Sequence, residues 1–226
     1  KIAIPALLAS IAEPLLSSTD AAVVGNIDTN ATEALAAVGI VGAFLSMLIW
    51  ILGQTRSAIS AIISQYVGAN KQDQVTTLPA QAISIVVLGS FFVMVISYPF
   101  SKQIFQFYNA SGVVLTYCIT YFKIRIFGFP FSLFVFAVFG IFRGLQNTYY
   151  PMIIAIIGAL LNIVLDFILV YGIEGFIPAM HIKGAAYASV IAQITMAIIA
   201  FVLLLQFYLL DSELDVDKEL SLKMEN

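Results

Sequence analysis

Two aspartates lie well inside long apolar stretches of the sequence, where a charged side chain is costly. Asp20 belongs to the stretch Ile2 to Ile27, and Asp166 belongs to the stretch Tyr149 to Tyr171. An ionisable residue at membrane depth normally faces the protein interior and marks a pathway for ions or protons. We therefore expect both carboxyl groups to be functional.

Further polar residues share a helix face with these aspartates. Glu13 and Asp20 are seven residues apart, close to two helical turns, which puts them on one face about 10 Å apart. Asn162 and Asp166 are four residues apart and so stack on one face of their helix. The sequence thus predicts a polar face on each of two helices.

The depths of the polar residues predict that they meet. At a rise of about 1.5 Å per residue, Asp20, Asp166 and Ser189 lie roughly 10, 9 and 8 Å below the outer ends of their spans. Asn162 lies one turn deeper, and Gln193 lies about one turn below Ser189. Carboxylate, amide and hydroxyl oxygens suit a hard cation such as Na⁺, whereas a proton needs only a carboxylate whose pKa has been raised by burial. The same side chains suit either ion.

A purely structural role is the alternative for these residues. Each polar side chain could hydrogen-bond to a neighbouring helix and only stabilise the packing, and this alternative stays open for Glu13 and Gln193 as for the others. Pro5 and Pro14 each remove a backbone hydrogen bond from the first helix and favour a kink that would move Asp20. That kink could be static or could serve as a gate.

Three cationic residues also lie within the apolar stretches. Arg56 lies toward the inner end of its span, where its side chain can reach the interface. Lys123 and Arg125 lie in the outer half of the fourth span, and they could pair with an acid or line an aqueous cavity. His181 lies in a loop, and Cys118 is the single cysteine. No catalytic set arises from these residues, so we expect no enzyme.

The composition requires a membrane environment. Of the 226 residues, 61% are hydrophobic and 10% are charged, and the mean hydropathy is +1.01, which is far more apolar than a soluble domain. The net charge is −3, and many of the acids follow Tyr208. The lipid bilayer is therefore an expected partner, and nucleic acid is not.

The breaks between apolar stretches divide the chain into six spans, because a transmembrane helix needs roughly 20 apolar residues. The predicted spans are Ile2 to Ile27, Ala34 to Val67, Val75 to Phe100, Val113 to Phe142, Tyr149 to Tyr171 and Gly184 to Leu210. The second is long enough to tilt or to project from the membrane. We expect an all-α transmembrane six-helix bundle over residues 1–210 and an acidic polar linker over residues 211–226.

Four segments carry a resemblance to a known family. They are Pro14 to Gly25, Ala34 to Gly39, Arg143 to Thr148 with Pro151, and Leu161 to Asp166 ending at Gly172. In order and spacing they resemble the multidrug and toxic compound extrusion (MATE) family, and most of all its DinF-like branch. The resemblance covers nearly the whole chain up to Leu210.

The resemblance implies a fold and an activity. Such proteins are twelve-helix transporters with two six-helix lobes around a cleft, and this chain resembles the N-terminal lobe. It implies a cation-coupled antiporter, driven by H⁺ or Na⁺, that exports organic, drug-like compounds by alternating access and uses no cofactor. The linker would then lead toward a second six-helix lobe of the same full-length chain. The protein would be multi-pass in the cell (inner) membrane, with both termini of this segment cytoplasmic.

The resemblance also implies residue roles. Asp20 matches the ion-coupling acid of the first helix, Asn162 and Asp166 match a pair in the fifth, and Ser189 stands where the family usually has Thr. Na⁺ is therefore a possible metal at these four residues. Pro5 matches the family's bending proline, and Glu13 and Gln193 are candidates for the cavity or for gating. Two other functions remain: a lipid-linked precursor flippase of the same superfamily, which would want a cationic cavity, and a non-transporting membrane assembly subunit.

Overall fold

The computed structural model describes residues 7, 18–28, 30–69 and 77–224, with side chains as far as Phe207. Most of the predicted first span lies outside these residues, as do Pro5, Glu13 and Pro14. The described part of the chain consists of helices joined by loops, and its single β-bridge joins Ile173 to Ile177.

The described helices include five that are long and apolar enough to cross a membrane. They are Ala31–Gly68, Leu78–Ser97, Gly112–Gly144, Tyr149–Tyr171 and Ile182–Phe207. The second to sixth predicted spans are thus confirmed. A run of about 20 apolar residues forms a helix in hydrocarbon because its backbone groups must be hydrogen-bonded within the segment.

The first of these spans is interrupted, which the prediction of one helix from Ala34 to Val67 missed. Helix α2 (Ala31–Gly53) ends and α3 (Thr55–Gly68) begins on either side of Gln54. Gly53 is the last residue of α2, and glycine is a poor helix former. The Thr55 hydroxyl also donates to the Leu52 carbonyl oxygen at 2.6 Å. Such a side-chain bond competes with the helical backbone and favours a break at this point.

The fourth predicted span, Val113 to Phe142, is interrupted as well. Helix α6 (Gly112–Arg125) passes through one turn of 3₁₀-helix, η2 (Ile126–Gly128), into α7 (Phe129–Gly144). Pro130 lies in the first turn of α7, where its missing N–H is tolerated. Because Pro130 has no backbone N–H to donate to the turn before it, the regular α-helical hydrogen bonding is interrupted there, and the tighter turn precedes α7.

The remaining helices complete the bundle. Helix α4 (Leu78–Ser97) is followed by the short α5 (Ser101–Phe107), which lies in a segment predicted as a loop. Helix α8 (Tyr149–Tyr171) has the predicted bounds. Helix α9 (Ile182–Met224) runs beyond the apolar span, so residues 211–224 are helical.

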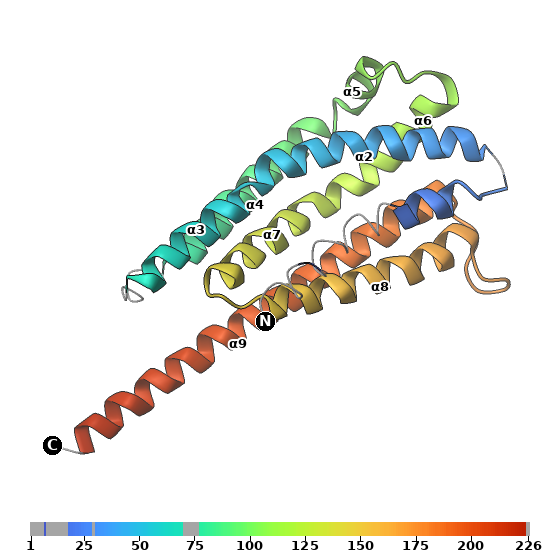
Figure 1. The fold of residues 1–226 in the computed structure, drawn as a ribbon. Coiled ribbons are helices and arrows are strands. Elements are labelled where there is room, and N and C mark those ends of the chain that lie inside the picture. The colour runs from blue at the N-terminus through green and yellow to red at the C-terminus, as the bar shows by residue number, and fades with distance from the viewer. Residues whose placement is uncertain (1–6, 8–17, 29, 70–76, 225–226) are drawn as a thin grey trace.

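The helices pack in pairs along the long axis of the molecule. Helix α8 lies along α9, α3 and α4 lie along α7, and α2 and α9 flank α6 (Figure 1). We call the end that carries residues 172–181 the outer end and the end that carries residues 145–148 the inner end. One apolar cluster, which includes Phe44, Phe105 and Phe122, fills the outer half; a second, which includes Phe142 and Ile154, fills the inner half.

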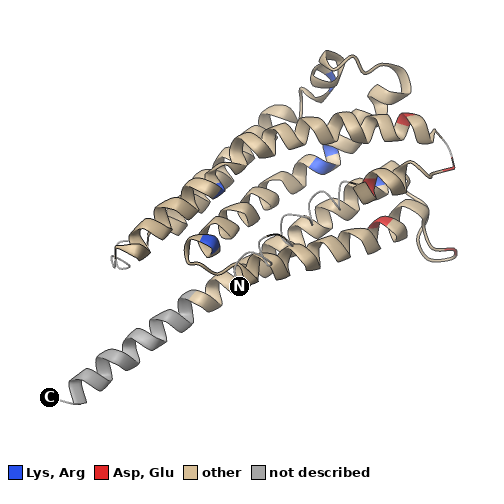
Figure 2. Cartoon of the chain, in the orientation of Figure 1, with Lys and Arg blue, Asp and Glu red and all other residues tan. Residues whose placement is uncertain are grey.

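The outer surface of the bundle is apolar. On α2 and α4, Trp50, Leu88 and Phe92 are 71%, 69% and 66% exposed, and charged residues are sparse along the helices (Figure 2). Large apolar side chains facing outward suit hydrocarbon. The chain is therefore a membrane protein whose buried polar residues stand out against an apolar background.

Candidate functional site

Four polar residues are buried where three helical segments meet near the outer end. Asp20 comes from the N-terminal segment 18–24, Asn162 and Asp166 come from α8, and Ser189 comes from α9. Their exposed fractions are 6%, 2%, 0% and 5% respectively. The structure thus brings together the four residues that the sequence predicted as ion-coupling ligands. We call them the acid site.

Ser189 links the other two helices of the acid site. Its hydroxyl donates to Asp20 Oδ2 at 3.2 Å, and it accepts from Asn162 Nδ2 at 3.3 Å. The N-terminal segment is also fixed to α8 by the Tyr171 hydroxyl, which donates to the Val23 carbonyl oxygen at 2.9 Å. Because all three bonds cross between elements, they determine how Asp20 sits relative to α8 and α9.

The Asn162 amide has two orientations with different partners. Turned over, its nitrogen donates to Asp20 Oδ1 at 3.1 Å, and its oxygen accepts from the Ser189 backbone N–H at 3.3 Å. This second orientation matches each donor with an acceptor, as buried polar groups require. Asp20 then accepts one hydrogen bond on each carboxyl oxygen.

Asp166 differs from Asp20 in having no donor. Its two carboxyl oxygens are buried and accept no hydrogen bond from any group in the described part of the chain. The carboxyl group of Asp20 is its polar neighbour, and the two acids interact directly. A buried carboxylate without a donor is costly, so this pair favours a shared proton or a bound cation.

Two further residues act on the acids from α6, and the predicted site did not include them. Tyr121 is buried and interacts electrostatically with both Asp20 and Asp166. Arg125, one turn further along, acts on Asp166 and on Tyr121, and its guanidinium carbon lies 5.9 Å from the Tyr121 ring centroid. Arg125 carried a sequence signal, namely a charge inside a span, whereas nothing in the sequence singled out Tyr121.

The other three predicted site residues, Gln193, Pro5 and Glu13, are not part of the acid site as the structure describes it. Gln193 lies one turn below Ser189 on α9, where its side-chain oxygen abuts Gly128 of η2 and is buried without a hydrogen-bond partner. Gln193 therefore lies at the helix interruption, and no hydrogen bond joins it to the acid site. Pro5 and Glu13, the remaining candidates, lie outside the described residues.

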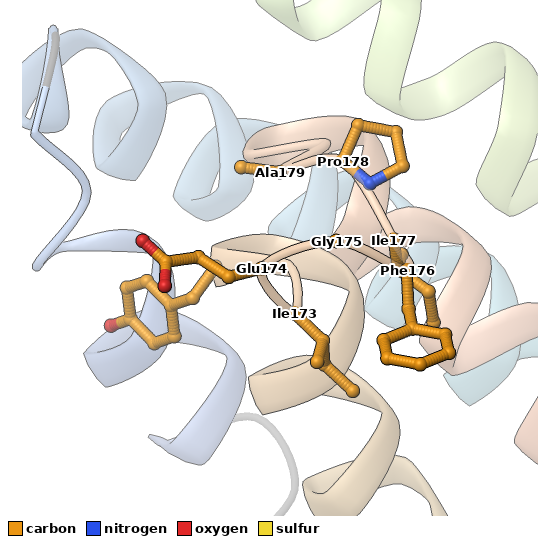
Figure 3. A pocket seen from close by; sticks show the side chains of 8 residues that line it. Ile173, Glu174, Gly175, Phe176, Ile177, Pro178 and Ala179 are labelled. Atoms are coloured by element: carbon orange, nitrogen blue, oxygen red, sulfur yellow. The ribbon is translucent and has the colours of Figure 1, made fainter.

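Two open hollows lie near the outer end, and neither contains the acid site. One, of about 490 Å³, is formed by the loop after α8 and is lined by Tyr171 and residues 173–179 (Figure 3). The other, of about 320 Å³, lies between the N-terminal segment and α8 and includes Thr19 and Phe167. Because Thr19 and Phe167 adjoin Asp20 and Asp166 in sequence, this second hollow lies beside the acid site.

The long apolar helices and the polar residues buried between them define the class as a multi-pass helical membrane protein. The MatE family model matches residues 5–168. The chain therefore belongs to the multidrug and toxic compound extrusion (MATE) family. This is a family of transporters, in agreement with the expectation that the chain is not an enzyme.

Individual relatives agree with this assignment. The chain is 29% identical over 193 residues to DNA damage-inducible protein F of Escherichia coli, covering 85% of this chain and 40% of that protein. It is 30% identical over 219 residues to multidrug resistance protein NorM of Vibrio vulnificus, covering 94% of this chain and 44% of that protein. The chain thus spans less than half the length of the curated relatives it matches.

Solved structures share the fold. The MATE transporter VcmN of Vibrio cholerae in its bent form superposes with a TM-score of 0.80 at 21% identity, covering 91% of this chain and 45% of that one. An inward-facing MATE transporter of the MOP superfamily superposes with a TM-score of 0.74 at 23% identity. The fold is thus that of part of a MATE transporter, as the sequence predicted.

Proposed function

We propose that this chain is one lobe of a cation-coupled antiporter that exports organic, drug-like compounds by alternating access. The observation that carries the proposal is the buried carboxyl group of Asp166, which lies beside Asp20 and has no donor in the described part of the chain. Membership of the MATE family supports transport as the activity. The names of relatives such as NorM, a multidrug resistance protein, support a drug-like substrate.

Coupling follows from the electrostatics of the two acids. Two adjacent carboxylates in a low-dielectric interior repel one another, so a proton or a cation stabilises the pair. The acids come from segments that Ser189 and Asn162 connect. Arrival of the ion therefore changes the forces between the helices, and this gives ion binding a way to bias one conformation over another.

The donor set suits either coupling ion. Carboxylate, amide and hydroxyl oxygens from Asp20, Asp166, Asn162 and Ser189 suit Na⁺. The carboxyl pair alone suits H⁺. No cofactor is needed beyond this ion.

The rest of the transporter comes from outside this chain's described helices. We propose that residues 211–226 lead toward a second six-helix lobe in the same full-length protein, and that the two lobes enclose the substrate cleft. The protein would lie in the cell (inner) membrane with both termini of this segment on the cytoplasmic side.

Two other functions receive less support. A lipid-linked precursor flippase would want cations gathered around one cavity, but Arg56 lies over Phe136 and Lys123 lies over Tyr98, against different rings. In an assembly subunit the polar residues would only hold helices together. The bonds of Ser189 fit that role, whereas the buried carboxyl group of Asp166, beside a second acid and without a donor in the described part of the chain, does not.

The test is Asp20→Asn in the full-length protein, assayed for substrate export in vesicles with an imposed H⁺ or Na⁺ gradient. Because an amide cannot bind a proton and is a weaker cation ligand, we expect gradient-driven export to fall by about tenfold or more. Asp28→Asn is the matched control. Asp28 is exposed in the loop after the same segment, so export by the Asp28→Asn variant should equal export by the wild type.

Equal export by Asp20→Asn and the wild type, at equal protein levels, would contradict the coupling role. Thermal unfolding supplies an independent readout. The antiporter predicts that Na⁺ or H⁺ stabilises the wild-type protein but not Asp20→Asn, because a ligand that binds the folded state raises its stability. Helix packing alone predicts no difference in ion response between the two.

A further inference from the structure

Arg125 lies beside the acid site without forming an ion pair in the described part of the chain. Its guanidinium acts electrostatically on Asp166, and its Nε is buried without a hydrogen-bond partner. Asp166 likewise has two buried oxygens without a donor. A partly buried cation and a buried anion thus interact electrostatically, and each keeps buried polar atoms without a hydrogen-bond partner.

Tyr121 interacts with both the arginine and the acids. The Arg125 guanidinium carbon is 5.9 Å from the Tyr121 ring centroid, and Tyr121 interacts with Arg125, Asp20 and Asp166. A guanidinium over an aromatic face has a stable resting place close to its anion. Since an arginine side chain is long and has several rotatable bonds, its guanidinium can change position without a change of backbone.

The other cation on this helix faces elsewhere. The Lys123 Nζ lies 5.4 Å from the ring centroid of Tyr98, which follows the last residue of α4. Two cations on one helix, two residues apart, are thus held against different rings. Only Arg125 of the pair acts on Asp166.

Arg125 is also the last residue of α6, directly before the 3₁₀ turn η2. On the far side of this turn, Gly128 abuts the side-chain oxygen of Gln193 on α9. Mid-helix 3₁₀ turns are places where a helix can change its course. A shift of Arg125 therefore acts at the junction between α6 and α7.

We propose that Arg125 is a built-in competitor of the coupling cation. When neither a cation nor an added proton neutralises the acids, its guanidinium moves onto the Asp20–Asp166 pair, and arrival of the coupling ion displaces it toward Tyr121. Arg125 is thus a positioning residue that sets ion affinity and assists ion release. This inference rests on the proposed coupling role of the acid site.

The acids of the Asp20–Asp166 pair and the charged and titratable groups around them come from several packed elements. The N-terminal segment supplies Asp20, α8 supplies Asp166, and α6 supplies Tyr121 and Arg125. Helix α9 supplies the uncharged Ser189 and Gln193. Arg125 is therefore the one described cation that can compensate the two acids, and its removal should strengthen the binding of an external cation.

The experiment compares Arg125→Gln with Lys123→Gln in the full-length protein. Thermal unfolding of purified protein is followed against NaCl, with choline chloride keeping the ionic strength constant, and separately against pH. For Arg125→Gln we expect half-maximal stabilisation at about tenfold lower Na⁺, or at a pH about one unit higher if H⁺ is the ligand. In vesicles its maximal export rate should fall, because the ion leaves more slowly. Lys123→Gln should match the wild type in each measurement.

The outcomes separate this inference from the proposed function. If Arg125→Gln and Lys123→Gln shift the midpoint equally, or if neither shifts it, Arg125 is not the competitor. If Arg125→Gln does not fold, Arg125→Lys keeps the charge and should retain a wild-type midpoint; an altered midpoint in that variant would overturn the proposal. Loss of ion response in Asp20→Asn alongside an unchanged midpoint in Arg125→Gln would reject only this inference. An Asp20→Asn variant that keeps coupled export and the ion response would reject both.

Discussion

The two aspartates of the acid site have unequal surroundings. Asp20 accepts from Ser189 and, in the better-matched orientation, from Asn162, so its negative charge is stabilised by two donors. Asp166 has none within the described residues. In the proposed coupling role, the charge of Asp166 therefore depends more on an incoming ion than the charge of Asp20 does.

The Ser189 hydroxyl can be tested by its removal. In Ser189→Ala the carboxylate of Asp20 loses a buried donor, which should lower the free energy of unfolding by about 1–3 kcal/mol. Ser189→Thr keeps the hydroxyl and should stay within about 1 kcal/mol of the wild type. Both would be measured by thermal unfolding of the purified full-length protein.

Ser84→Ala is the control for this measurement. Ser84 is exposed on α4, and its hydroxyl donates to the Ala80 carbonyl of its own helix at 2.7 Å. Its loss should cost less than about 0.5 kcal/mol. A Ser189→Ala variant that is no less stable than Ser84→Ala would argue against the bond to Asp20.

Single residues were predictable where their type was costly in a membrane. Asp20 and Asp166 stood out because carboxylates are rare inside apolar spans, and the four-residue spacing put Asn162 beside Asp166. Tyr121 could not be found in this way, because a tyrosine in an apolar span is ordinary and only the packing of α6 against α9 brings it to the acids. The coupling roles themselves remain predictions.

At the scale of elements, close approach of α3 and α7 depends on two glycines. A Cβ at Gly140 would lie 2.7 Å from the Arg56 carbonyl oxygen, and one at Gly144 would lie 2.7 Å from Ile63 Cβ. Small residues let membrane helices come close enough for their backbones to touch. The position of Arg56, and with it its contact with Phe136, follows from this approach.

Gly140→Ala should therefore push the two helices apart. The obstacle is backbone, which cannot rotate away, so we expect a loss of about 1–3 kcal/mol in unfolding free energy. Gly89→Ala on α4 is the control, since no atom lies within 4 Å of its added Cβ, and alanine should be neutral or stabilising by up to about 1 kcal/mol there. Unfolding of the two variants in detergent gives the comparison; equal stability would mean that α3 and α7 tolerate the methyl group.

The sequence predicted the helices better than their interruptions. Long apolar runs determined the five described membrane-length helices, because backbone groups in hydrocarbon must be bonded internally. The breaks at Gln54 and at residues 126–128 depend on the weaker preferences of Gly53, Thr55 and Pro130, which tertiary packing can override. Helix α5 was missed because its seven residues carry too little pattern to distinguish a helix from a loop.

At the scale of the whole molecule, polar groups are concentrated toward the interior and the outer end, whereas the lateral surface is apolar. Helix α8 illustrates this division: Asn162 and Asp166 are buried, while Leu160 and Val164 are 59% and 54% exposed. The exposed face suits either lipid or the second lobe that we propose. The division requires the bundle to be embedded, and its two ends must then face opposite sides of the membrane.

The proposed orientation can be tested because Cys118 is the single cysteine of the chain and is fully buried. Glu174 and Thr77 are exposed and lie at opposite ends of the bundle, in the loop after α8 and directly before α4. If any cysteines elsewhere in the full-length protein are replaced by serine, a membrane-impermeant maleimide applied to intact cells should label Glu174→Cys but not Thr77→Cys. Permeabilised cells should label both, and the parent protein should remain unlabelled throughout because its thiol is shielded by packing. The reverse pattern in intact cells would place residues 172–181 in the cytoplasm, and the acid site would then lie nearer the cytoplasmic than the external side.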